Sequence, residues 1–357
     1  MSRGYIQQIV LEKFACFRDC SFNLFLKPQP GWNVIMGENG SGKTSLLKAI
    51  VFALRQKRTP IASCNRGSFV STGANTSGIY VKTNNPNGHE LNWNIHLDNQ
   101  GELTAQLNLW GPLQYGDYAN PDERIRLIAF GSDRDTAPHV QFFNETNDLL
   151  DKTMGSLFSD PDISDGIAWL SRVRSRSFDV DHNPQSFRDE CTKTHADVVD
   201  LLNQLNLIPG DLQIVCVTSD RVQIKKRGSE AISFLYMESK ATQRTVALLA
   251  SLTSWLLRDA KASITSPNGY PIVDVPGVVL IDEPELALHP SIVSKLGPQL
   301  CKHFPRVQFI VTTHNALICE AASEQGLFRL LSSNEVQPEE SLVITLSRNN
   351  IPNLCDS

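Results

Sequence analysis

The sequence predicts an α/β fold with a mixed or parallel core sheet, an antiparallel β lobe and an inserted helical lobe. A glycine-rich motif at residues 37–44 stands between a short apolar run and a helix-like run. Two continuous apolar runs, at residues 278–281 and 307–312, are typical of parallel strands buried on both faces. Segments between residues 79 and 109 instead alternate apolar and polar residues, which predicts the antiparallel lobe.

The composition indicates a globular chain, since 41% of its 357 residues are hydrophobic and 20% are charged. The net charge of −5 excludes a general basic field for nucleic acid, so such contacts would need local patches. No apolar run is long enough to span a bilayer, and the N-terminus lacks the apolar core of a signal peptide. The eight scattered cysteines lack zinc-like spacing, and we interpret them as reduced thiols. We therefore expect a cytoplasmic protein without a membrane partner.

The first half of the chain is expected to be mainly β-structure around one helix. Expected strands lie at residues 5–13, 21–25, 34–36, 79–82, 91–97, 103–109 and 126–130, the last closing the antiparallel region. The helix after the glycine-rich motif is expected to run to about residue 55. A polar segment at residues 58–78 is expected to be a loop.

The second half is expected to begin with helices and end with strands. Expected helices are at residues 165–173, 185–207 and 239–257, a hairpin at 214–226, and late strands at 327–331 and 342–346. We expect one head with a nucleotide-binding core at 1–57 and 208–357, an antiparallel β lobe at 58–143 and a helical lobe at 144–207.

The glycine-rich motif fits the phosphate-binding pattern G-x-x-x-x-G-K-[ST]. The candidate nucleotide-binding residues are Gly37, Glu38, Asn39, Gly40, Ser41, Gly42, Lys43, Thr44 and Ser45. Glycines let the backbone turn its N–H groups toward phosphates, and the helix N-terminus adds its dipole. Lys43 is placed to reach the β- and γ-phosphates, and Thr44 to offer a hydroxyl to Mg²⁺. The motif predicts binding of ATP or GTP.

Two carboxylates and a histidine follow the buried runs. Asp282 and Glu283 end the first run, where a parallel strand delivers them to the ligand-binding edge of a sheet. Asp282 is placed to hold Mg²⁺, and Glu283 to polarise the water that attacks the γ-phosphate. His314 follows the second run and is placed to contact the γ-phosphate. With Lys43, these residues predict nucleotide hydrolysis.

The three motifs together resemble those of ABC-type ATPase heads, in the group that includes the OLD (overcoming lysogenization defect) proteins, RecF and SMC-like ATPases. They lie at residues 37–44, 281–290 and 312–315. The Asp-Glu-Pro-Glu and Leu-His-Pro form of the second motif is most similar to the OLD-related AAA-type ATPases of bacterial anti-phage systems. The resemblance implies an ABC-type head that hydrolyses ATP with Mg²⁺. Residues 60–230 match this family only in organisation.

The resemblance also implies an ATP-dependent head-to-head dimer, in which a signature loop of one head reaches the γ-phosphate bound by the other. Ser239 aligns with the family's serine, Ala241 with its glycine, and Lys240 adds positive charge. Ala241 lacks glycine's freedom at φ > 0 and adds a methyl group, so a nucleotide-gated scaffold with little turnover is an alternative to an active ATPase. Ser239 is alternatively only a helix cap. Arg134 is a candidate for approaching the nucleotide, with a solvated loop as the equal alternative.

The expected partners follow from analogy and from charge. OLD proteins proper continue into a nuclease-type domain, for which we expect no room after His314, so we expect a separately encoded effector, a nuclease, as in two-gene defence systems such as Septu. Two basic clusters are candidates for DNA contact, although short basic runs are more often solvated faces. The first cluster is Arg172, Arg174 and Arg176, and the second is residues 225–227. A RecF-like DNA-repair ATPase is the alternative, and a transporter subunit is a weaker one.

Overall fold

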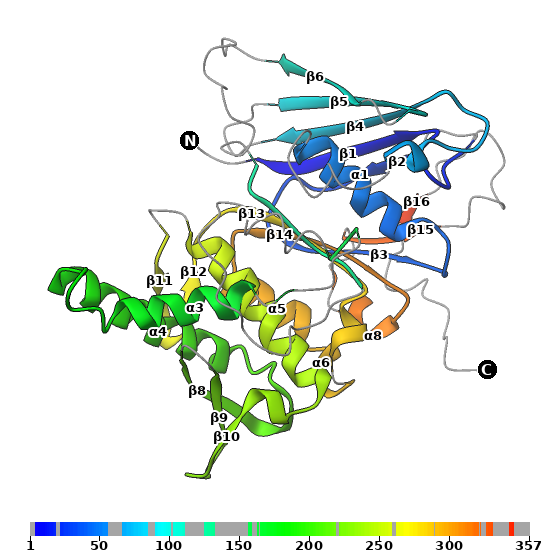
Figure 1. Ribbon diagram of the computed structural model, residues 1–357. Coiled ribbons are helices and arrows are strands. Elements are labelled where there is room, and N and C mark those ends of the chain that lie inside the picture. The colour runs from blue at the N-terminus through cyan, green and yellow to red at the C-terminus, as the bar shows by residue number, and fades with distance from the viewer. Residues whose placement is uncertain are drawn as a thin grey trace, which may run out of the picture. The chain divides into compact units, whose positions relative to one another are not determined.

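The computed structural model contains two compact units, whose helices and strands are drawn in Figure 1. Unit 1 comprises Met1–Ala129, Pro276–Pro284 and Arg306–Ser357, and unit 2 comprises Phe130–Val275 and Glu285–Pro305. The structure describes residues 4–18, 22–55, 66–84, 90–100, 103–110, 125–132, 156–158, 163, 165–218, 221–258, 262–288, 290–320, 322, 326–330 and 343–345. Because the segments of the units alternate along the chain, each unit is built from residues that are far apart in sequence.

The first sheet of unit 1 is antiparallel, with the strand order β2-β1-β4-β5-β6. Its strands are β1 (Tyr5–Glu12), β2 (Phe22–Phe25), β4 (Thr76–Asn84), β5 (Glu90–Asp98) and β6 (Leu103–Trp110). Buried residues alternate with less buried ones along β5, which matches the alternation in the sequence. Helix α1 (Lys43–Arg55) contacts β4 and β5. The three strands expected between residues 79 and 109 are thus confirmed, and β1 and β2 extend the same sheet.

The second sheet is the core sheet that positions the candidate site. Its order is β16-β15-β3-β14-β13-β7. The strands are β3 (Gly31–Gly37), β7 (Leu127–Phe130), β13 (Gly277–Asp282), β14 (Val307–Thr313), β15 (Leu327–Leu330) and β16 (Val343–Thr345). β13, β14, β3 and β15 are parallel, whereas β16 is antiparallel to β15. Every residue of β13 and β14 is buried, which explains their continuous apolar sequences and confirms the predicted parallel strands.

Strand β7 differs from the expectation drawn from the sequence. We predicted that residues 126–130 close the antiparallel region, but β7 lies beside β13 at one edge of the core sheet. All four of its residues are buried, and the Arg126 carbonyl accepts a hydrogen bond from the Val278 N–H at 2.7 Å. A short strand without a solvated face fits a sheet that is covered on both sides, which is why it joins the core sheet.

Unit 2 contains most of the helices. They are α3 (Asp165–Arg176), α4 (Gln185–Gln204), α5 (Lys240–Leu257), α6 (Pro290–Val293) and α7 (Leu296–His303), while α8 (Ala316–Cys319) belongs to unit 1. A three-stranded antiparallel sheet has the order β10-β9-β8, from β8 (Leu212–Val217), β9 (Val222–Lys226) and β10 (Ile232–Phe234). A small ribbon pairs β11 (Ile264–Thr265) with β12 (Ile272–Val273). The predicted helices and the hairpin are confirmed, and residues 144–155 of the expected helical lobe lie outside the described residues.

The buried helix α5 forms the core of unit 2. Most of its length is buried, and it crosses α3 where Gly166 leaves room for its backbone. The Ser251 hydroxyl joins the two segments, since it accepts from the Gly166 N–H at 3.1 Å and donates to the Ile163 carbonyl at 2.8 Å. In the part of the chain that the structure describes, no helix combines the length and hydrophobicity needed to cross a bilayer.

Candidate functional site

The glycine-rich motif forms the turn between β3 and α1, as the sequence predicted. Close packing requires glycine at two of its positions. A Cβ atom at Gly37 would lie 2.6 Å from Ser41 Oγ and 2.8 Å from the carbonyl oxygen of Leu330. Gly42 has a φ of +100°, and a Cβ atom there would lie 2.5 Å from Cys16 Sγ. The surrounding chain of unit 1 therefore determines the shape of this loop.

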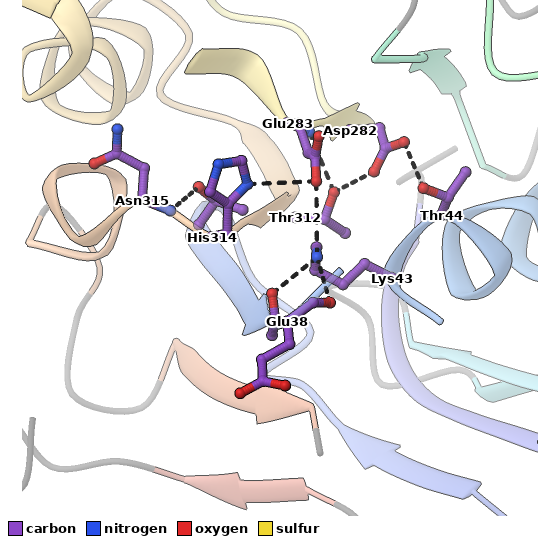
Figure 2. Close-up of polar contacts among 10 residues, drawn as sticks. Glu38, Lys43, Thr44, Asp282, Glu283, Thr312, His314 and Asn315 are labelled. Atoms are coloured by element: carbon purple, nitrogen blue, oxygen red, sulfur yellow. Dashed lines mark hydrogen bonds and ion pairs between the residues drawn. The ribbon is translucent and has the colours of Figure 1, made fainter. Parts of the chain in front are cut away.

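Lys43 points back over the loop, as Figure 2 shows. Its side chain is 5% exposed, and Nζ donates hydrogen bonds to the carbonyl oxygens of Gly37 at 2.8 Å and Glu38 at 2.9 Å. The same nitrogen lies 3.7 Å from Glu283 Oε1. A buried ammonium group needs such hydrogen-bond partners. The same three N–H donors could also donate hydrogen bonds to phosphate oxygens. Ser41 Oγ is buried in the same loop and has no hydrogen-bond partner among the described residues.

Asp282 lies at the carboxyl end of β13, where the sequence predicted it. It is fully buried, and both carboxylate oxygens accept hydrogen bonds from hydroxyl groups (Figure 2). Thr44 Oγ1 donates to Oδ2 at 2.7 Å, and Thr312 Oγ1 donates to Oδ1 at 2.5 Å. The first residues of α1 and the end of β14 thus meet at one carboxylate.

Glu283 follows directly and turns away from the strand direction. Its φ of +43° lies in the left-handed region, which is uncommon for a residue other than glycine. Its N–H donates to the carbonyl oxygen of Thr312 at 3.0 Å and to Thr312 Oγ1 at 3.3 Å. With this turn, Glu283 Oε1 lies 3.7 Å from Lys43 Nζ and 3.5 Å from His314 Nδ1.

His314 lies between β14 and the short helix α8. Its side chain is 48% exposed, so one side of the ring faces solvent while Nδ1 faces Glu283. The turn that carries it is held by two hydrogen bonds. Asn315 N–H donates to Thr313 Oγ1 at 2.8 Å, and Asn315 Oδ1 accepts from the Leu317 N–H at 2.9 Å as the N-cap of α8.

The donors around Asp282 fit Mg²⁺ held together with nucleotide phosphates. Mg²⁺ prefers hard oxygen ligands and commonly takes one or two carboxylates plus substrate phosphates rather than a full protein cage. Thr44 Oγ1 and Asp282 Oδ2 are 2.7 Å apart and supply such oxygens. Among the described residues there is no group of three or more His, Cys, Asp or Glu side chains that could hold a metal by itself. The hydroxyl of Thr44 and the carboxylate of Asp282 are thus the oxygen donors at this point that fit Mg²⁺.

The predicted signature loop lies in unit 2, at the start of α5. Ser239 is the N-cap, and its Oγ accepts from the Thr242 N–H at 3.2 Å, so Ser239 caps α5 whether or not it has a second role. Lys240 begins the helix and Ala241 follows in its first turn. Ala241 does not have a positive φ, so the change from the family's glycine requires no strained backbone there. Contact between this loop and a nucleotide on another head stays a prediction.

The remaining candidates are less informative. Arg134 lies outside the described residues. Arg172, Arg174 and Arg176 lie on α3, and the Arg174 guanidinium sits 4.4 Å from the centre of the Phe178 ring. In the second basic cluster, Lys225 Nζ lies 3.9 Å from Glu230 Oε1. DNA contact by these clusters stays a prediction.

Thr312 opens the motif at residues 312–315, but the sequence did not assign it a role at the site. It connects Asp282 and Glu283 through one hydroxyl and one carbonyl group. The signals in the sequence were its place at the start of that motif and its hydroxyl near the end of the buried run before His314. Such a threonine is common in strands, so the pattern alone could not separate a role at the site from β-propensity.

Comparison with known proteins identifies the family. A family model described as "AAA domain, putative AbiEii toxin, Type IV TA system" matches residues 32–320. The chain is 34% identical over 107 residues to the "Retron Ec83 probable ATPase" of Escherichia coli, a match that covers 30% of this chain and 18% of that protein. It is 23% identical over 338 residues to the "Septu protein PtuA" of Bacillus mycoides (strain KBAB4), covering 93% of this chain and 41% of that protein. The chain thus spans less than half the length of both relatives.

The fold is that of an SMC ATPase head. The SMC head bound to the C-winged helix domain of ScpA superposes with a TM-score of 0.59 at 14% sequence identity, covering 96% of this chain and 98% of that one. This likeness confirms the predicted fold class, an α/β ABC-type head with a mixed core sheet and antiparallel strands.

Proposed function

Because the chain belongs to the AAA-domain family whose model matches residues 32–320, we propose that it binds ATP with Mg²⁺ and hydrolyses the bond to the γ-phosphate. The observation that carries the proposal is the meeting of the phosphate-binding loop with the acidic strand end. Thr44 and Asp282 are 238 positions apart in the chain, yet they share a hydrogen bond of 2.7 Å. Lys43 and Glu283 meet beside them at 3.7 Å.

Binding of the nucleotide is assigned to the loop and the first turn of α1. Backbone N–H groups of the loop and Lys43 Nζ would donate to the β- and γ-phosphates. The buried hydroxyl of Ser41 is a further donor within the same loop. Thr44 and Asp282 would hold Mg²⁺, which neutralises phosphate charge when bound. The shape of the loop is already determined by its neighbours, so its backbone donors need little reorganisation to meet the phosphates.

Hydrolysis is assigned to Glu283 and His314. Glu283 would accept a hydrogen bond from the attacking water and orient it in line with the γ-phosphate. His314 Nδ1 lies 3.5 Å from the same carboxylate oxygen, so it is placed to hold that oxygen or the phosphate beside it. Lys43 would stabilise the charge on the phosphate oxygens as the bond breaks.

The test compares steady-state ATP hydrolysis by the full chain and by Glu283→Gln. Removing the group that orients the water is expected to lower kcat by about 10²- to 10⁴-fold, while the Kd for ATP stays within a few-fold. Glu12→Gln, at the exposed end of β1, is the matched control and should keep the wild-type rate. Equal rates for wild type and Glu283→Gln would contradict the hydrolytic role. That result, with ATP still bound, would support the alternative of a nucleotide-gated scaffold, which is suggested by Ala241 in the place of the family's glycine.

We further propose that ATP joins two copies of the chain head to head. Ser239 and Lys240 are exposed at the N-terminus of α5, an 18-residue helix whose N–H groups and positive end suit an anion. The γ-phosphate bound to the partner head is the anion that this arrangement would meet. Mass measurement of Glu283→Gln with and without ATP tests the proposal, since slowed hydrolysis should trap the dimer. A monomer under both conditions would contradict it.

The biological role that we propose is anti-phage defence through a separately encoded effector, a nuclease. It is supported by the similarity to proteins named as a retron ATPase and a Septu protein. The test expresses the chain together with its neighbouring genes and counts phage plaques, with Lys43→Ala as the comparison. Protection that is lost in Lys43→Ala is expected. Protection by the neighbouring genes without this chain would contradict the role.

A further inference from the structure

We propose that Thr312 is a positioning residue of the ATPase reaction, which sets the orientation of Asp282 and the backbone turn of Glu283 with a single hydroxyl group. The inference rests on the proposed function. Thr312 is fully buried near the end of β14, the strand next to β13 in the core sheet. Asp282 is paired with Thr312 in the parallel register. This pairing places the hydroxyl of one strand beside the carboxylate of the next.

The first effect is on Asp282. A carboxylate can rotate about its last side-chain bond, so one donor leaves it loosely oriented, whereas donors on both oxygens determine its plane. Thr312 Oγ1 donates to Oδ1 at 2.5 Å, which directs Oδ2 toward Thr44 Oγ1 at 2.7 Å. Oδ2 and the Thr44 hydroxyl are the oxygens assigned to Mg²⁺. Outer partners of this kind orient the groups that bind a metal and commonly change its affinity when they are removed.

The second effect is on Glu283. A non-glycine residue with φ near +43° is strained and persists only where its surroundings hold it. The Glu283 N–H is shared between the Thr312 carbonyl at 3.0 Å and the Thr312 hydroxyl at 3.3 Å. These bonds hold the turn that brings the Glu283 carboxylate to Lys43 and His314. The hydroxyl of Thr312 donates to Asp282 and accepts from Glu283 at the same time, so its hydrogen can point in one direction only.

The two effects separate Thr312 from an ordinary core threonine. Loss of the hydroxyl removes one hydrogen-bond donor from the buried carboxylate of Asp282 and weakens the hold on a strained turn. Loss of the methyl group only leaves a small gap in β14. The hydroxyl should therefore matter for Mg²⁺ and for the chemical step, whereas the methyl group should matter only for packing.

The experiment compares Thr312→Val, which keeps the shape, with Thr312→Ser, which keeps the hydroxyl. Thr253→Val is the matched control, because Thr253 is a fully buried threonine in unit 2 whose hydroxyl donates to the Leu249 carbonyl at 2.8 Å. Two quantities are measured: kcat for ATP hydrolysis, and the Kd for ATP by calorimetry in excess Mg²⁺ and in EDTA.

In Thr312→Val, kcat should fall by about 10- to 100-fold, and the gain in ATP affinity on adding Mg²⁺ should shrink by a similar factor. Its Kd in EDTA should stay within about threefold of wild type. Thr312→Ser should recover most of both quantities, and Thr253→Val should match wild type. A folded Thr312→Val variant with wild-type kcat and a wild-type gain in ATP affinity on adding Mg²⁺ would overturn the proposal. The proposal would also fail if Thr312→Ser lost as much of both quantities as Thr312→Val. If the wild type itself does not hydrolyse ATP, the proposed function fails, and the calorimetry still tests Thr312.

Discussion

Replacing Gln308 with methionine should destabilise unit 1, because the Gln308 side chain joins its two sheets. Gln308 is fully buried on β14 and reaches the antiparallel sheet at β1. Its Oε1 accepts from the Ile6 N–H at 2.8 Å, and its Nε2 donates to the carbonyl oxygens of Ile6 at 2.9 Å and Lys27 at 3.0 Å. The pairing of β1 with β4 shifts register between Ile6 and Gln8, so the side chain satisfies backbone groups at an irregular point of the ladder.

The magnitude follows from the groups that lose their partners. The Ile6 N–H and carbonyl are buried, and leaving each unsatisfied costs about 1–3 kcal/mol. The Lys27 carbonyl is part-buried, so water can replace Gln308 there at little cost. Burying a thioether in place of an amide returns about 1 kcal/mol. We expect a net loss of about 3 kcal/mol, which for a unit of this size lowers the unfolding midpoint by about 6–12 °C.

The assay is thermal unfolding, combined with amide hydrogen exchange at β1. Gln8→Met is the matched control, since the part-buried Gln8 side chain donates to Asn23 Oδ1 at 3.0 Å, and this change should cost less than about 1 kcal/mol of stability. Exchange at Ile6 should become faster in Gln308→Met alone. If Gln308→Met unfolds at the wild-type temperature with the exchange of Ile6 unchanged, the reasoning is refuted.

Two further predictions concern unit 2. Gly166→Ala should lower the free energy of unfolding by at least about 3 kcal/mol, because a Cβ atom there would lie 2.1 Å from the Ser251 backbone nitrogen and α3 and α5 would have to separate. A thermal midpoint within about 2 °C of wild type would contradict this. Burial lowers the pKa of His303, whose Nδ1 donates a hydrogen bond to the Pro271 carbonyl at 2.6 Å and which lies near Lys302 and Asp200. The unfolded chain therefore takes up a proton at this histidine before the folded chain does, and the stability of the fold should decrease as the pH drops below about 6.5. Thermal midpoints at pH 7.5 and 5.5 should differ less in His303→Gln than in wild type, and equal differences would exclude His303 as the cause.

Much of the site could be predicted from the sequence because its chemistry is encoded in short local patterns. The phosphate-binding loop needs only eight consecutive residues between a strand and a helix, and residues 37–44 supply them. The continuous apolar runs before Asp282 and His314 predicted buried parallel strands whose ends meet at one edge of a sheet. Local patterns could not decide which sheet β7 joins, because strand pairing depends on partners far away in the chain.

The sequence by itself therefore determined which residue types the site contains and at which strand ends they lie. Only the tertiary structure decided how they act on one another: that Thr312 bonds both Asp282 and Glu283, and that Glu283 takes a φ of +43°. The physical reason is that hydrogen bonds between neighbouring strands depend on register and on backbone angles. Both are set by the packing of the whole unit rather than by the residues adjacent in the chain.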